Sequence, residues 1–385
     1  MKSQKKISSI LFLITIVFAL SAANTVHAVE VTATINVGTY PQGVAYDSGK
    51  GEIFVANEGL PKTVSVINDS SNTVIATIPI GTGIAGVAYD SGKDEIFVTD
   101  FDLNMVLVIS DNSNTVVANV TVGAGPFDLA YDSSKGEIFV TNDLSYTVSV
   151  ISDSNNAVVA TIPMGNNPEG IAYDSSKGEI FVANFISNTI SVINDSSNTV
   201  VANIPVGIDP TGVAYDSGKG EIFVSDEEDL IHGNTSAVLL ISDSSNTLVG
   251  SVRVNAYPNG LTYDSSKGEI FVAIQGSNMV SVINDTSNSV VANVTVGVGP
   301  SNLAYDSDKG EIFVTDWGVL NGGGPAGDTV SVLSDAAGTT ASHSPTVPEF
   351  SWASFILLMV AMLVVIFCAV ALTIKKVDQS NLQSK

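Results

Sequence analysis

The sequence has very little of three residue types on which many functions depend. Its 385 residues include one cysteine, Cys368, one arginine, Arg253, and three histidines. A single cysteine excludes a disulfide framework and a cysteine-based metal cluster. The chain has 39 acidic and 15 basic residues, a formal net charge of −24. Nucleic acids are bound through many Lys and Arg contacts to phosphate, so this composition excludes a nucleic-acid partner.

Long apolar runs are confined to the two ends of the chain. Three lysines precede the apolar run Ile7–Leu20, and Val26-His27-Ala28 has the small and β-branched residues of a cleavage site. This pattern predicts a secretory signal peptide over residues 1–28. The alternative is an uncleaved anchor helix.

The C-terminal run predicts a membrane anchor. Trp352–Ile374 is 23 residues long and uncharged, enough to cross a hydrocarbon core of ~30 Å. Lys375 and Lys376 then place residues 375–385 in the cytoplasm. Residues 338–351 are rich in Ser, Thr and Pro, a composition that predicts an extended stalk. The remainder, residues 29–337, would be an extracellular domain on the cell surface, with the membrane as one partner.

One motif recurs seven times between these ends. AYDSGKGEIFVAN at 45–57 returns with small changes, and the spacing of its tyrosine is 42 residues in four of the six steps. The tyrosines are Tyr46, Tyr89, Tyr131, Tyr173, Tyr215, Tyr263 and Tyr305. A fixed period of this length indicates a repeat architecture.

Each repeat contains four strand signals and no helical pattern. In the first repeat they are GVAYD (43–47), EIFVAN (52–57), TVSVIN (63–68) and TVIATIPIG (73–81). Gly51 supplies a positive-φ position in the first turn. Pro79 has no N–H group, which places the fourth strand at a sheet edge. We therefore predict an all-β fold, a seven-bladed β-propeller of four-stranded antiparallel blades.

Counting the strands predicts how the ring closes. The seventh repeat ends at Asp328–Asp335 without a fourth strand, whereas the spare strand Val31–Gly38 precedes the first repeat. We expect Val31–Gly38 to pair with Thr329–Leu333 and complete the last blade, which leaves the ring without an open end.

The motifs EIFVAN, EIFVTN and VVANVTVG resemble the YVTN family of β-propeller repeats, found in archaeal surface-layer-type proteins. The resemblance covers Val29–Asp335. Phe replaces the family's Tyr in all seven repeats, and Ile274 replaces the Asn or Asp that ends the second strand elsewhere. The resemblance to this family implies a propeller on an archaeal cell surface, and it does not identify the ligand.

Candidate binding residues follow from the loops. The turns DSGKG, DSSKG and DSSN are nearly identical between repeats, whereas the loops on the opposite face differ, and varied loops carry recognition. The aromatic residues in those loops are Phe101, Tyr146, Phe185 and Trp317. Trp317 has two readings, packing on a loop or binding a sugar.

The carboxylate run Asp226, Glu227, Glu228 and Asp229 is the candidate for a structural Ca²⁺ site; a solvated loop is the alternative. No other cofactor is predicted. Six N-x-[ST] sequons are candidates for glycosylation: Asn68, Asn119, Asn194, Asn234, Asn284 and Asn293.

Three functional hypotheses remain. The first is a non-catalytic structural or interaction protein of the cell envelope, with envelope proteins or glycans as partners. The second is a propeller enzyme of the lyase or quinoprotein type. His232 stands alone, and no catalytic motif is present. The third is a module that binds a cation or a glycan through the varied loops.

The residues just before the apolar run suggest a second kind of anchor. Pro348-Glu349-Phe350, the apolar helix and the two lysines resemble the PEF-type sorting signal that archaeosortases process. The resemblance implies cleavage near residues 348–350. A retained membrane span explains the same residues, since 23 apolar residues anchor a chain firmly.

Overall fold

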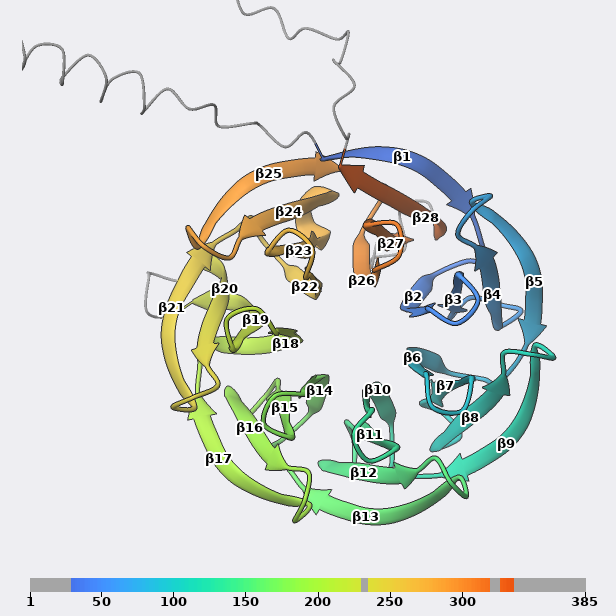
Figure 1. The fold of residues 1–385 in the computed structure, drawn as a ribbon, viewed down its shortest axis with the longest axis horizontal. Coiled ribbons are helices and arrows are strands. Elements are labelled where there is room, and N and C mark those ends of the chain that lie inside the picture. Colours follow the sequence, from blue (N-terminus) through green and yellow to red (C-terminus); the bar gives the residue numbers. More distant parts are fainter. Residues whose placement is uncertain (1–28, 230–234, 319–325, 336–385) are drawn as a thin grey trace, which may run out of the picture. The chain divides into compact units, whose positions relative to one another are not determined.

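Seven four-stranded antiparallel sheets form one closed ring. The computed structural model describes residues 29–229, 235–318 and 326–335, and all seven sheets lie within them (Figure 1). Each blade has its first strand at the centre of the ring and its fourth at the outside (Figure 1). The predicted seven-bladed β-propeller is confirmed.

The strands have the following bounds. Blades 1 to 4 are β2 (Pro41–Asp47), β3 (Glu52–Asn57), β4 (Thr63–Asn68), β5 (Thr73–Pro79); β6 (Ile84–Asp90), β7 (Glu95–Asp100), β8 (Met105–Ser110), β9 (Thr115–Thr121); β10 (Pro126–Asp132), β11 (Glu137–Asn142), β12 (Thr147–Ser152), β13 (Ala157–Pro163); and β14 (Pro168–Asp174), β15 (Glu179–Asn184), β16 (Thr189–Asn194), β17 (Thr199–Pro205). Blades 5 to 7 are β18 (Ile208–Asp216), β19 (Glu221–Asp229), β20 (Thr235–Ser242), β21 (Thr247–Arg253); β22 (Pro258–Asp264), β23 (Glu269–Ile274), β24 (Met279–Asn284), β25 (Ser289–Thr295); and β26 (Pro300–Asp306), β27 (Glu311–Gly318), β28 (Ala326–Asp335), β1 (Val29–Asn36). A 3-10 turn, η1 (Gln275–Ser277), joins β23 to β24.

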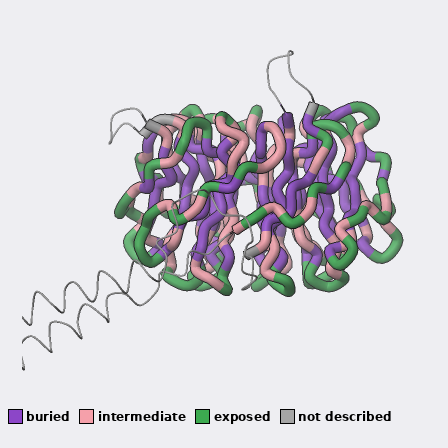
Figure 2. The backbone as a smooth tube through the Cα atoms, turned by 90° about the horizontal axis from the view of Figure 1, so that it is seen from above, coloured by how far each residue is buried: buried purple, intermediate pink, exposed green. Residues whose placement is uncertain are grey.

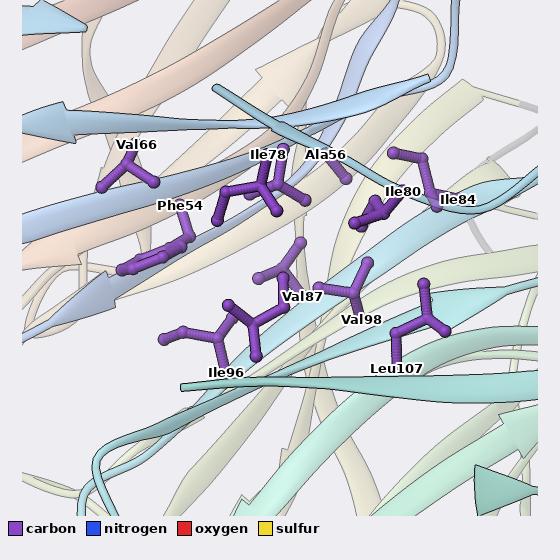
Figure 3. Packing of buried hydrophobic residues seen from close by; sticks show 12 residues of the cluster. Phe54, Ala56, Val66, Ile78, Ile80, Ile84, Val87, Ile96, Val98 and Leu107 are labelled. Atoms are coloured by element: carbon purple, nitrogen blue, oxygen red, sulfur yellow. The ribbon is translucent and has the colours of Figure 1, made fainter. Parts of the chain in front are cut away.

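The core consists of seven apolar clusters, and the first shows how they are built. Phe54, Ala56 and Val66 of blade 1 pack against Ile96 and Val98 of blade 2 (Figure 3). The second strand of each blade has neighbouring blades on both sides, which explains why EIFVA is apolar at successive positions. The phenylalanine of that motif is at most 2% exposed in every blade. We expect truncation of this phenylalanine to Ala to lower the free energy of unfolding by about 3–5 kcal/mol.

The fourth strand of each blade faces solvent, and each contains a β-bulge. In blade 1 Val66 pairs with Ala76 and Ile67 with Val74, so Ile75 is the extra residue. A bulge re-aims the extra side chain, and Ile75 is 51% exposed. The bulge returns in every blade, with Thr32 as the extra residue in blade 7. In the other six blades the extra residue is an exposed apolar side chain, and we call these six the outer belt: Ile75, Val117, Val159, Val201, Val249 and Val291. Pro79 lies on this outermost strand, as predicted.

The ring is closed by the two ends of the domain. β1 pairs with β28 from Val29 opposite Asp335 to Asn36 opposite Thr329. Ile35 of β1 is 5% exposed and packs with Val330 and Val332. The predicted closure by the N-terminal strand is therefore confirmed, and the pairing starts two residues earlier than expected.

Several predicted segments lie outside the described residues. These are the signal peptide (1–28), the stalk (338–351), the transmembrane helix (352–374) and the tail (375–385). In the described ranges there is no helix with the length and apolar character needed to cross a membrane.

Candidate binding face

The two faces of the ring carry different kinds of connection. On one, which we call the turn face, lie the turns between first and second and between third and fourth strands. On the other, the variable face, lie the loops between second and third strands and those leading to the next blade. Exposed segments line both rims, with buried strands between them (Figure 2).

The repeated turns join one blade to the next. Within blade 1, Gly49 N and Lys50 N donate to Asp47 Oδ1 at 2.8 and 3.2 Å, the local turn chemistry expected of Asp. Lys50 Nζ also reaches Asp111 Oδ1 of blade 2 at 3.5 Å. The same blade-to-blade ion pair returns in four further places: Lys135–Asp195, Lys177–Asp243, Lys219–Asp285 and Lys309–Asp69.

The tyrosine of the repeat belongs to the same junction. Tyr46 OH of blade 1 donates to Asp308 Oδ2 of blade 7 at 3.0 Å. Burial, followed by hydrogen bonds to Asp308 and Asp306, raises the pKa of Tyr46. The AYDSxKG motif thus serves assembly of the ring. The turns were predicted as chain geometry, and their second role as contacts between blades was missed.

Near the ring centre, hydroxyl side chains form a second set of hydrogen bonds between neighbouring blades. Thr141 Oγ1 donates to Glu169 O of the next blade at 2.8 Å, and Thr315 Oγ1 donates to Gln42 O at 2.8 Å. Thr99 Oγ1 donates to Phe127 O at 3.0 Å. These contacts fix the backbone of the first strands, whose side chains line the central channel.

The channel contains a polar cavity of about 60 Å³. Six first strands contribute polar side chains to its wall: Gln42, Asp128, Glu169, Thr211, Asn259 and Asn302. At the next position of the first strand five blades have glycine: Gly43, Gly86, Gly170, Gly212 and Gly260. A Cβ on Gly170 would lie 2.2 Å from Thr211 O of the neighbouring blade. The glycines therefore allow the first strands to approach closely at the centre.

Glu169 is the most perturbed carboxyl group of the channel. Burial, followed by the charges of Asp143, Glu227, Asp209 and Asp128, raises the pKa of Glu169 to about 8. Burial also raises the pKa of Asp128 to about 6. A carboxyl group among like charges is stabilised when a positive charge approaches it, or when it stays protonated and therefore neutral. The channel mouth, meaning Asp128, Asp143, Glu169 and Asp209, is thus suited to a cationic group.

An aromatic pair lies on the variable face where blades 7 and 1 meet. The rings of Tyr40 and Trp317 are 5.8 Å apart at 59°, a tilted arrangement favourable for aromatic pairs. Trp317 Nε1 donates to Glu58 Oε2 at 3.3 Å. A groove of about 430 Å³ lies at the same junction between blades 7 and 1, lined in part by Thr39, Leu60 and Asp328.

The predicted aromatic residues are distributed around this face. Tyr146 is 44% exposed, and Phe101, Phe185 and Trp317 are half-buried. Trp317 belongs to the end of β27, not to a loop. Its contacts with Tyr40 and Glu58 support packing for this side chain, and the four residues do not converge on one pocket.

The acidic run has a different structure from the predicted loop. Asp226 to Asp229 end strand β19, and Asp226 is fully buried at the position of Asn57 in blade 1. Glu227 is half-buried, and the side chains of Glu228 and Asp229 are outside the described part. Among the described residues, no three His, Cys, Asp or Glu side chains are grouped to hold a metal ion.

The sequons fall into two structural groups. Asn119 and Asn293 are exposed on the outermost strands β9 and β25. Asn68, Asn194 and Asn284 end the strands β4, β16 and β24, and each Oδ1 accepts a hydrogen bond from the backbone N–H three residues later, in the turn that follows. Asn234 lies outside the described residues.

Comparisons with known proteins support the fold. The chain is similar to a solved structure described as Kuenenia stuttgartiensis hydrazine synthase, with a TM-score of 0.67 and 14% identity over 83% of this chain and 99% of that one. At that identity the likeness shows the fold alone. No family model and no curated protein matches the chain.

Proposed function

We propose that this chain is a non-catalytic binding protein of the cell envelope, a propeller held on the cell surface, whose variable face contacts the partner. The observation that carries the proposal is the different distribution of exposed apolar side chains on the two faces. Among the residues that the structure describes, seven of the fourteen exposed large apolar side chains lie on the variable face, and the other seven lie on the outermost strands. On the described part of the turn face there are none.

The exit point of the chain is consistent with surface display. Val29 lies opposite Asp335 at the turn-face end of blade 7, so the chain enters and leaves the propeller on that face. A C-terminal anchor, either the span at 352–374 or a processed PEF-type signal, would then attach to the turn face. The variable face would be free to meet a partner. The YVTN-type motifs give the same envelope setting by resemblance.

The proposal is tested by site-specific photo-crosslinking on intact cells. A photoreactive residue replaces Leu60, 85% exposed on the variable face, or Asn112, exposed in a turn of blade 2. We expect adducts with envelope components from position 60 and few from position 112. Equal adducts from both positions, or none from position 60, would contradict the proposal.

The two alternative functions, a propeller enzyme and a module that binds a cation or a glycan, are tested by separate experiments. The channel mouth is the place where a propeller enzyme or a cation-binding module would act, because burial raises the pKa values of two of its carboxyl groups, Asp128 and Glu169. Turnover of a substrate that is lost in Glu169→Gln would favour the enzyme. Binding by the full-length protein to a panel of metal ions and glycans addresses the third hypothesis.

A further inference from the structure

Three tyrosines of the variable face have a backbone conformation that suits other residues. In the loops leading to the next blade, one position has positive φ in six blades: Tyr40 (54°), Gly125 (64°), Asn167 (53°), Asp209 (58°), Tyr257 (62°) and Gly299 (62°). Before the third strand, the equivalent residues are Asn104 (56°), Tyr146 (56°), Asn188 (55°) and Asn278 (53°). The repeat thus shows which residues this fold uses there, namely Gly, Asn and Asp.

Tyrosine at these positions is unfavourable for folding. The left-handed region brings Cβ close to the backbone, and Gly, Asn and Asp tolerate it better than bulky residues. Burial does not compensate, because Tyr40, Tyr146 and Tyr257 are 37%, 44% and 56% exposed. Strained, exposed residues are characteristic of functional sites. Tyr40 also packs against Trp317.

The surroundings of the tyrosines are apolar and acidic. Leu60, Leu103, Leu144 and Ile186 are between 48% and 85% exposed on the same face. Seven of the eight lysines between residues 29 and 335 belong to the DSxKG-type turns of the other face. Lys62 and Arg253, which is exposed at the end of β21, are the basic residues at the variable face. Asp102 is exposed there, and Glu58, Asp143 and Asp209 are half-buried.

We infer that Tyr40, Tyr146 and Tyr257 are contact residues for a basic polypeptide segment that lies across the variable face. This inference rests on the binding role proposed above and names the partner's chemistry. Apolar side chains of the segment contact the leucines and Ile186, and its Lys or Arg side chains approach the carboxylates. Tyr is enriched at such interfaces because it gives a large contact area with a polar end.

Charge and shape favour a polypeptide over a neutral glycan. A neutral sugar would leave the excess of carboxylates uncompensated, whereas a cationic partner is attracted to it. Sugars stack on flat aromatic rings, and the branched side chains of Leu60, Leu144 and Ile186 fit apolar side chains better. A second copy of this acidic chain fits poorly for the same electrostatic reason.

The test separates strain from contact. We expect Tyr146→Asn, which installs the residue of three sibling blades, to raise the melting temperature. The same substitution and the triple variant Y40N/Y146N/Y257N should weaken binding. Val159→Ser, in the outer belt and 52% exposed, is the control that should change neither property much.

The probe is an array of 12-residue peptides on a Gly-Ser background, carrying Lys and Leu, Lys alone, Leu alone, or Glu and Leu. Full-length protein should bind the Lys and Leu peptides, and the triple variant should bind them at least tenfold more weakly. Preference for the Glu and Leu peptides, binding to neutral glycans instead, or no binding would overturn the assignment of the partner. Binding that ignores the three tyrosines would overturn their role.

These outcomes are distinguishable from failure of the proposed function. Adducts from position 60 on intact cells, together with no peptide binding, would retain the binding face and reject the basic partner.

Discussion

Lys135 of blade 3 forms an ion pair with Asp195 of blade 4, with Nζ and Oδ1 3.2 Å apart and the Asp195 side chain only 6% exposed. Lys135→Met leaves a buried carboxylate without its cation. We expect a loss of about 1–3 kcal/mol in the free energy of unfolding, measured by urea denaturation. The double variant K135M/D195N should recover part of the loss. Lys62→Met on the variable face is the control, and an equal loss there would refute the pairing as the cause.

Ring closure predicts a sensitive position in β1. Ile35→Ala truncates a side chain buried between blades 7 and 1 and should cost about 2–4 kcal/mol. Thr34→Ala, at the exposed neighbouring position of the same strand, should change stability by less than about 0.5 kcal/mol. Deletion of residues 29–38 should lower the melting temperature greatly. Unchanged melting after this deletion would show that β1 is dispensable.

The carboxyl group of Glu169 predicts a dependence of stability on pH. Its pKa is raised from 4.5 to about 8 in the folded chain, so the folded chain holds a proton that the unfolded chain releases between these values. Stability contributed by this group therefore falls as pH rises through that window. Glu169→Gln should melt at a higher temperature than the parent at pH 8.5 and at nearly the same temperature at pH 5. Glu30→Gln, exposed on β1, is the matched control, and parallel curves for parent and E169Q would contradict the prediction.

Glycosylation should follow the exposure of the sequons. Asn119 and Asn293 are exposed, and Asn293 Oδ1 accepts a hydrogen bond from Ser281 Oγ at 2.8 Å. Asn68, Asn194 and Asn284 are half-buried and accept hydrogen bonds from backbone N–H groups of the tight turns that follow them. We expect mass spectrometry of the native protein to find glycan at 119 and 293 and little at the three turn positions. The reverse distribution would show that local turn structure does not control occupancy.

The C-terminus has two proposed fates with different masses. A retained span leaves Lys385 on surface-resident protein, and processing of the PEF-type signal gives a terminus near residue 350. For the retained span, protease added to intact cells should remove the propeller and spare a C-terminal tag. Loss of that tag without lysis would contradict the proposed orientation.

The repeat made most of the fold predictable. Period and strand signals located β3 and β4 at their observed bounds, and the missing fourth strand of the last repeat identified β1 as its replacement. Contacts between blades were harder to predict from the sequence. The contact between Lys50 and Asp111 can be inferred only once the order in which the blades pack around the ring is known. Asp226 looked like a loop residue for a related reason, since the end of β19 depends on pairing with β20.

The candidate site was predicted only in outline. The variable loops and Tyr146 were recognised, but Tyr40, Tyr257 and Glu169 were missed. Aligning the repeats against one another would have given a signal: Tyr40 and Tyr257 share a column with glycine, asparagine and aspartate, and Glu169 shares one with neutral residues. What no alignment of repeats could supply is the φ angle that makes a tyrosine costly in that column.

The pairing of β1 with β28 also sets a timetable for biosynthesis. Thr32 contacts Val332, 300 residues later in the chain. At 5–20 residues per second, the ribosome needs roughly 15–60 s to make that stretch. During this time β1 has no partner strand, and the apolar face of blade 1 that will meet blade 7 remains uncovered. A nascent chain of this design therefore depends on protection from aggregation until its last strand emerges.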